Sequence, residues 1–191
     1  MENRTEDRLQ ITDLINGWIH RDLNEWEQLR SLFHPDGTIE VTWFEGLFGD
    51  FVTGSERMGA SDIRTKHLMG SPIITFKGDK AIVETNAIII AENIKLNVGC
   101  NGHNRFYDLM EKRDGVWKLF HRQSIYDMGT FTFPMGMVEI DAATAEKYPR
   151  EYAALAYVLE KSGFPVKRVF ATRGSELERK MKAEGQAWLN A

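Results

Sequence analysis

The hydrophobic period of the chain changes at His34-Pro35-Asp36-Gly37, and this change constrains the fold more than any other feature. Before it, apolar residues recur mostly three to five positions apart, as on the inner face of an amphipathic helix. After it, Thr38–Phe44 alternates and is rich in β-branched and aromatic residues, which predicts a strand. The chain is therefore expected to form helices first and strands after them. The expected apolar face of the first helix consists of Leu9, Leu14, Ile15, Trp18 and Ile19.

Capping and turn residues divide the rest of the chain into further elements. Asn24, with Glu27 three residues later, predicts a capping box at the start of a second helix. Gly78-Asp79 and Arg113-Asp114-Gly115 predict tight turns between strands. The order of helices, antiparallel strands and helices indicates an α+β fold with a curved sheet around the first helices. Beyond these turns we expect a glycine-rich loop at 46–54, a short helix at 55–66, strands at 72–76, 80–92, 103–112 and 116–126, loops at 93–102 and 130–137, and helical segments at 142–161 and 175–189.

Composition excludes several classes of function. The 24 basic residues against 28 acidic ones give a net charge of −4, which argues against binding to nucleic acid. The longest apolar run, Ala87–Ala91, is too short to cross a bilayer, and the polar N-terminus does not resemble a leader peptide. Cys100 is the single cysteine, so no internal disulfide can form. We expect a soluble, cytoplasmic protein that binds neither nucleic acid nor membranes.

Few side chains are candidates for chemistry. The chain lacks the common phosphate-binding, nucleotide-binding and serine-hydrolase motifs, and its histidines lack metal-ligand spacing, so we expect no cofactor and no metal. Asp22 ends the first helical region, where it either caps a turn or places a carboxylate at the mouth of an aromatic pocket. His67, expected between a helix and an apolar strand, is either structural or a base that exchanges protons near neutrality.

Other residues are candidates for contact with a substrate. Arginine, histidine and tyrosine side chains are more often structural or solvated, but they can also bind developing negative charge or polar substituents. Large aromatic residues near the predicted helix end and on the predicted strands are expected in the core or in a pocket wall. The candidates are Arg21, His103, Tyr107 and Arg122 as polar groups, with Trp18 and Trp43 as apolar walls.

Two groups of residues together resemble a known family. The segments 11–22 and 26–36 (ITDLINGWIHRD and WEQLRSLFHPD) resemble the opening of SnoaL-like domains in the nuclear transport factor 2-like superfamily. The segment 105–119, with Arg113-Asp114-Gly115-Val116-Trp117, resembles the last hairpin of that superfamily. The resemblance covers about residues 5–127 and implies a cone-shaped α+β barrel. We accordingly expect a barrel domain at 1–128 and a C-terminal helical extension at 129–191 that packs on the barrel or on a neighbouring subunit.

Within the superfamily, the chain is most similar to scytalone dehydratases and hexachlorocyclohexane dehydrochlorinases. These enzymes have an aspartate at the end of the first helix and a histidine just before the next strand, which match Asp22 and His67. The resemblance implies that His67 is the base and that Asp22 orients it. The chain departs from the dehydratases at Arg21 and Val41, near which those enzymes have tyrosines. A further strand histidine of the dehydratases has no clear counterpart in this chain, for which His103 is a candidate substitute.

The resemblance implies a cofactor-independent lyase for a small apolar, aromatic or polycyclic molecule. The reaction is either dehydration or carbon–carbon cleavage that releases formaldehyde, with Arg21 or Arg122 stabilising negative charge. One alternative is an isomerase or cyclase, similar to ketosteroid isomerases and polyketide cyclases, in which an aspartate is the base. Another alternative is a ligand-binding module without turnover. The resemblance also implies a homo-oligomer, with a trimer favoured over a dimer.

Overall fold

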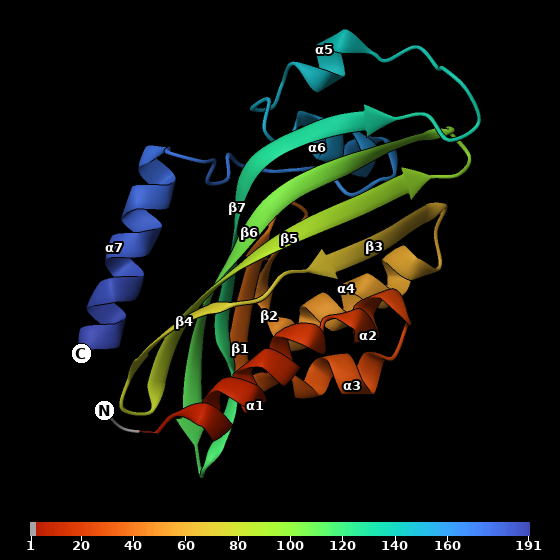
Figure 1. Cartoon of the computed structure of the whole chain (residues 1–191). Helices are drawn as coiled ribbons and strands as arrows, with labels where there is room; N and C mark the ends of the chain where they lie inside the picture. Colours follow the sequence, from red (N-terminus) through yellow and green to blue (C-terminus); the bar gives the residue numbers. More distant parts are fainter. Residues whose placement is uncertain (1–2) are drawn as a thin grey trace.

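The computed structural model describes residues 3–191 and places helices on both faces of one curled sheet (Figure 1). The N-terminal helices lie against the concave face of the sheet, and the C-terminal helix lies on the opposite, convex side (Figure 1). The helices are α1 (Thr5–Asn16), α2 (Ile19–Asp22), α3 (Trp26–Ser31), α4 (Phe48–Gly59), α5 (Ala142–Ala145), α6 (Ala153–Lys161) and α7 (Glu176–Asn190).

The strands follow the order β2-β1-β7-β6-β5-β3 across the sheet, and β4 also pairs with β5. Every pairing is antiparallel except that of β1 with β7, which is parallel. This arrangement confirms the expected α+β class and the curved, mostly antiparallel sheet. The strands are β1 (Phe33–Val41), β2 (Phe44–Leu47), β3 (Ile63–Met69), β4 (Ile73–Lys77), β5 (Lys80–Asn93), β6 (Val98–Arg113) and β7 (Val116–Thr132).

Tight turns and register shifts shape the sheet. Asp114 and Gly115 both have positive φ, at 51° and 80°, as a two-residue hairpin turn with right-handed twist requires. The pairing of β6 with β7 shifts register between His103 and Asn104 and again between Leu109 and Met110. Such irregularities bend strands and increase their twist. They allow the long strands β5, β6 and β7 to curl around the N-terminal helices (Figure 1).

The main core fills the concave face of the sheet. From α1 and the turn after it, Ile11, Ile15 and Trp18 are all at most 2% exposed, and they pack against Phe51 of α4 and Phe106 of β6. Burying apolar side chains is the dominant stabilising term in folding. The layer of side chains between α1, α4 and the sheet therefore holds the fold together.

The expected apolar face of the first helix matches the buried face only in part. Leu9 and Ile19 are 62% and 45% exposed, whereas Ile11 joins Ile15 and Trp18 in the core. The chain leaves α1 at Gly17 and α2 starts a new short helix, so Ile19 does not continue the face of α1. Leu9 lies before this break; it is two positions, or about 200° of helix rotation, from the buried Ile11 and therefore points to the opposite side of α1. The expected face was wrong for these two residues.

Three local expectations were also wrong. Most of the segment predicted as a glycine-rich loop lies in α4. Gly54 has no Cβ, which lets this helix approach Trp43, because an added Cβ would lie only 3.0 Å from the Trp43 ring. The helix expected at 55–66 ends at Gly59, and β3 begins at Ile63 because it pairs along β5. Asn24 does not cap a helix: it takes φ of 60°, and α3 begins at Trp26 without a side-chain cap.

The strands are also longer than the sequence indicated. β6 begins at Val98 and β7 runs to Thr132, so both enter segments expected to be loops. β7 passes without a break through the expected domain boundary at 128/129. The two strands extend each other by pairing, with Gly99 opposite Thr132.

The C-terminal region contributes to both faces of the sheet. Helix α6 packs against β5, β6 and β7, where Leu155 and Leu159 join a second core cluster with Cys100 and Tyr126. Helix α7 covers the convex face, where Met181 and Leu189 pack near Tyr107. In the part of the chain that the structure describes, no helix is long and apolar enough to cross a membrane.

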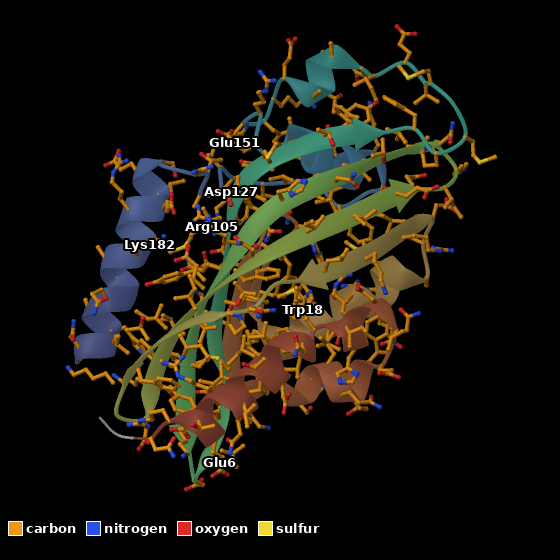
Figure 2. All side chains as sticks on the ribbon, viewed as in Figure 1. Glu6, Trp18, Arg105, Asp127, Glu151 and Lys182 are labelled. Atoms are coloured by element: carbon orange, nitrogen blue, oxygen red, sulfur yellow. The ribbon has the colours of Figure 1, made fainter. Side chains whose placement is uncertain are left out.

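Ion pairs also join α7 to the sheet. Arg105 of β6 donates hydrogen bonds to Asp127 of β7, to Glu84 of β5 and to Glu178 of α7, with N···O distances between 2.6 and 3.2 Å. Figure 2 shows Arg105, Asp127 and Lys182 together on the α7 side of the sheet, away from Trp18. Burial raises the pKa of the Glu178 carboxyl, but hydrogen bonds from the Gly174 backbone N–H, Arg105 and Lys182 outweigh it and lower this pKa to about 2.

Close packing between α7 and the sheet can be tested at Gly185. A Cβ at this position would lie 2.5 Å from the hydroxyl oxygen of Tyr107. We expect Gly185→Ala to lower the free energy of unfolding by about 1–3 kcal/mol, because overpacking outweighs the roughly 1 kcal/mol that alanine gains in a helix. Urea denaturation measures this change. The neighbouring exposed change Glu184→Ala should shift stability by less than about 0.5 kcal/mol, and equal effects of the two variants would contradict the close contact.

Candidate functional site

Asp22 and His67 are joined by two hydrogen bonds. Asp22 is the last residue of α2, and His67 lies in β3, which passes beside this helix end. The backbone N–H of His67 donates to Asp22 Oδ2 at 2.7 Å, and its ring Nδ1 lies 2.6 Å from Asp22 Oδ1. The two side chains are 1% and 7% exposed. Each oxygen of the carboxylate is therefore engaged by His67, which fixes the orientation of both groups.

This arrangement determines which ring nitrogen of His67 can act as a base. An ionised carboxylate only accepts hydrogen bonds, so Nδ1 of His67 carries the hydrogen. The other ring nitrogen, Nε2, then bears the free lone pair. His67 lines a cavity, and its ring meets Trp18 edge-on, with ring centroids 6.0 Å apart.

The surroundings of His67 favour its neutral form. Burial lowers the pKa of its imidazole below the usual 6.5, because the charged ring would lose its hydration. The hydrogen bond to Asp22 raises this pKa in part, and the nearby charge of Arg21 lowers it again. At neutral pH His67 is therefore unprotonated and able to accept a proton, and Asp22 is placed to stabilise the imidazolium that results.

Arg21 supplies a buried positive charge beside this pair. Its guanidinium donates to Thr65 Oγ1 at 2.5 Å and contacts the sulfur of Met58 at 3.3 Å. Burial lowers its pKa to about 10, so it stays charged at neutral pH. Among residues 3–191, no carboxylate lies within ion-pair distance of Arg21. Its charge is thus neither exposed to bulk water nor neutralised by direct pairing, which leaves it available to an anionic group in the cavity.

The cavity that contains these groups is narrow, with about 40 Å³ open to the centre of a water-sized sphere, and its wall is mostly apolar. Residues from the turn between α1 and α2, from α2 and α4, from the inner face of the sheet and from α6 line it. Leu155 and Leu159 of α6 form the part of the wall that belongs to the C-terminal region. The full lining consists of Trp18, Arg21, Val41, Thr42, Trp43, Phe51, Met58, Thr65, His67, Ile89, Ala91, Phe106, Tyr126, Leu155 and Leu159.

The structure brings only part of the predicted site together. Trp18, Trp43, Arg21 and His67 line the cavity, and Asp22 lies directly behind His67. Arg122 is fully buried but does not line the cavity. Its guanidinium donates to both oxygens of Asp108 at 2.7 and 2.8 Å, which pairs its charge.

The sequence predicted substrate contacts for His103 and Tyr107, but neither residue lines this cavity. Both lie on β6, where alternate residues point to opposite faces, and it is Phe106 that faces inward. His103 is exposed on the convex face, and Tyr107 lies under α7. The sequence contained the signal for this correction, since two adjacent strand residues such as Phe106 and Tyr107 cannot both face the same cavity.

Some lining residues could not be found from local sequence. Tyr126 reaches the cavity from β7, and its hydroxyl accepts a hydrogen bond from the Thr42 backbone at 3.1 Å. Thr65 and Met58 hold Arg21 from two different elements. Within residues 3–191, no group of three or more His, Cys, Asp or Glu side chains is arranged to hold a metal ion.

Comparison with known proteins agrees with this architecture. The sequence profile of the SnoaL-like domain matches residues 3–123. Pea pathogenicity protein 2 of Fusarium vanettenii is 27% identical over 167 residues, which span 79% of this chain and 68% of that protein. A structure of a candidate scytalone dehydratase from Novosphingobium aromaticivorans aligns with a TM-score of 0.58 at 23% identity, over 70% of this chain and 95% of that one. A hexachlorocyclohexane dehydrochlorinase from Novosphingobium barchaimii aligns with a TM-score of 0.60 at 20% identity, over 72% and 97%.

His67 gives stability a defined dependence on pH. Because its folded-state pKa lies below 6.5, the unfolded chain takes up a proton first as the pH falls. We expect the free energy of unfolding of the wild-type protein to decline relative to that of His67→Gln as the pH falls through 6.5, and the difference to be constant above about pH 7.5. Urea denaturation of both proteins across this range measures the effect. A difference that grows in favour of the wild type at low pH would contradict the lowered pKa.

Proposed function

The chain belongs to the SnoaL-like domain family, and from this premise we propose that it is a cofactor-independent lyase for a small apolar, aromatic or polycyclic molecule. The observation that carries the proposal is the buried pair of His67 and Asp22 at the wall of an apolar cavity. A binding pocket without chemistry has no need of a neutral imidazole held in one tautomer by a buried carboxylate. Two structurally similar proteins, a candidate scytalone dehydratase and a hexachlorocyclohexane dehydrochlorinase, bear the names of lyases.

In the proposed dehydration, Nε2 of His67 removes a proton from a carbon atom next to the carbon that bears the hydroxyl. The electron pair forms the new double bond while the carbon–oxygen bond breaks, and the departing oxygen takes a proton to leave as water. Asp22 stabilises the imidazolium between these proton transfers. No redox partner is required, because the atoms and electrons of the substrate are divided between the alkene and water.

Carbon–carbon cleavage uses the same groups in a different order. His67 would remove the proton of a primary hydroxyl group, the adjacent carbon–carbon bond would break, and formaldehyde would leave. The electron pair then remains on the carbon skeleton, which is finally protonated. Arg21 supports either reaction, because its cation at the cavity wall can stabilise the oxygen or carbon atom on which negative charge develops.

The geometry supports His67 rather than Asp22 as the base. The Asp22 side chain is 1% exposed, its two oxygens are both engaged by His67, and it does not line the cavity. An isomerase or cyclase that uses an aspartate base would need that carboxylate in contact with the substrate.

Loss of either member of the pair tests the proposal. With hydroxylated polycyclic compounds and aromatic diols as substrates, we expect His67→Ala to reduce kcat by about 10²–10⁴-fold, the usual contribution of general acid–base catalysis. Asp22→Asn should reduce kcat and also shift the ascending limb of the pH–rate profile to lower pH, since Asp22 raises the pKa of His67. Release of water or formaldehyde is followed by mass spectrometry.

A matched control lies close by in the chain. His20 contacts Glu25 at 2.6 Å, the same distance as in the proposed pair, but neither residue lines the cavity. His20→Ala should therefore retain turnover. Full activity of His67→Ala, or an unshifted pH profile in Asp22→Asn, would exclude the proposed acid–base pair.

Arg21→Met separates the charge of Arg21 from its volume. We expect kcat to fall by about 10²–10³-fold, as on removal of one oxyanion-binding donor. Thermal stability should be unchanged or higher, because the variant removes a buried charge that lacks a direct ion pair. Arg64→Met is the control, since Arg64 donates only to the backbone carbonyls of Ser61 and Ile63 outside the cavity. Unchanged turnover in Arg21→Met would exclude a role for this cation.

A further inference from the structure

A group of buried polar atoms without hydrogen-bond partners lies just beyond the cavity wall, around the ring of Phe106. Buried polar atoms are nearly always hydrogen-bonded in proteins, so a cluster of unpaired ones needs a physical explanation. Of the seven such side-chain atoms found among the described residues, six belong to this group. They are Trp18 Nε1, Thr85 Oγ1, Asn104 Nδ2 and Oδ1, Arg122 Nη1 and Ser124 Oγ.

Strand pairing gathers these atoms on one face of the sheet. Phe106 of β6 pairs with Thr85 of β5 on one side and with Ser124 of β7 on the other. Asn104 lies two residues along β6 on the same face, directly opposite Tyr126. The residues are therefore neighbours in the sheet, although they come from three strands.

Two further residues complete the cluster: Arg122, also from β7, and Trp18, from the turn between α1 and α2. The guanidinium carbon of Arg122 lies 4.2 Å from the centre of the Phe106 ring and 4.4 Å from that of Trp18. The Trp18 and Phe106 rings lie 5.6 Å apart. Because Trp18, Phe106 and Tyr126 all line the cavity, the polar cluster lies directly behind its wall.

A second buried asparagine of this sheet, by contrast, has hydrogen-bond partners. Asn93 of β5 is 4% exposed, and its amide donates to Ser162 Oγ at 2.9 Å and accepts from the Leu96 backbone at 3.0 Å. Asn104 is 2% exposed and has neither kind of partner. Apolar residues of similar size would avoid the free-energy cost of burying polar atoms without hydrogen-bond partners. The cluster therefore suits a partner that comes from outside the chain.

The charge of the cluster limits what that partner can be. The Arg122 charge is paired with Asp108, so the surroundings of its free Nη1 are neutral overall. Hydroxyl and amide groups both donate and accept hydrogen bonds, which suits a hydroxyl or ketone oxygen. A carboxylate would bring an unpaired charge, and a halogenated hydrocarbon would leave the polar atoms without partners.

We propose that this cluster is a polar subsite that binds a second, neutral oxygen substituent of the substrate, a hydroxyl or a ketone, while the reacting carbon lies at His67. The inference rests on the proposed function for the position of the reacting end. The six atoms are closed to solvent, so a lining ring, that of Phe106 or Trp18, changes rotamer when the substituent enters. The substrate is thus an oxygenated ring system with at least two polar positions.

Binding of two probes that differ by one oxygen tests the subsite without turnover. Isothermal titration calorimetry compares tetralin with 2-tetralone on the wild-type protein, on His67→Gln and on Asn104→Leu. We expect the wild type and His67→Gln to bind 2-tetralone at least about tenfold more tightly than tetralin, the equivalent of about 1.4 kcal/mol. Asn104→Leu should bind both probes with nearly equal affinity.

Thermal stability distinguishes the subsite from a purely structural role of Asn104, because a structural role predicts a lower Tm for Asn104→Leu. We expect Asn104→Leu to keep or raise Tm, because it removes unpaired buried polar atoms. Asn93→Leu is the matched control and should lower Tm, because it breaks two hydrogen bonds. Thr85→Val and Ser124→Ala should each reduce the preference for 2-tetralone and leave Tm unchanged or higher.

Several outcomes would overturn the subsite. Equal affinity of the wild type for both probes, or no binding of either, excludes it. An unchanged preference in Asn104→Leu would show that the cluster holds ordered water only, and loss of the preference in His67→Gln would assign the oxygen to the catalytic pair. A preference that depends on Asn104 in a protein without lyase turnover would retain the subsite and exclude the proposed reaction.

Discussion

The ring of Trp18 is the contact on which the rest of this structure depends. A curled sheet leaves a deep concave face, and that face must be filled for the fold to be stable. Trp18 enters it between α1 and α2 and packs against Phe51, Phe106 and His67, with ring centroids 5.6–6.0 Å apart. The same residue therefore closes the core and forms one wall of the cavity. Fold and site share their central side chain.

The electrostatics of the site follow from this burial. Water is excluded from the concave face, so each ionisable group there is either neutral, paired or held by polar contacts. His67 is neutral at pH 7, Arg122 is paired with Asp108, and Arg21 stays charged against Thr65 and Met58. One unpaired cation beside a neutral base suits chemistry in which a neutral substrate briefly becomes anionic.

The sequence predicted the pair at the centre of the site more accurately than its surroundings. Asp22 could be placed because a helix end is a local feature, and the resemblance to known enzymes connected it with His67 across 45 positions. Tyr107, a candidate for substrate contact, lies under α7, and its neighbour Phe106 is the residue of β6 that lines the cavity. The strand that carries His67 was missed, because β3 depends on its pairing with β5 rather than on its own propensity.

The sequence by itself determined the order of helices and strands, the hairpin turns and the placement of an aspartate where the first helical region ends. These features depend on residues within a few positions of one another, where periodicity, turn chemistry and backbone sterics act. Only the tertiary structure decided which face of β6 meets the cavity, that α6 closes it with Leu155 and Leu159, and that polar atoms gather unpaired behind Phe106. Each of these depends on exclusion of water by segments distant in the chain, which no local pattern records.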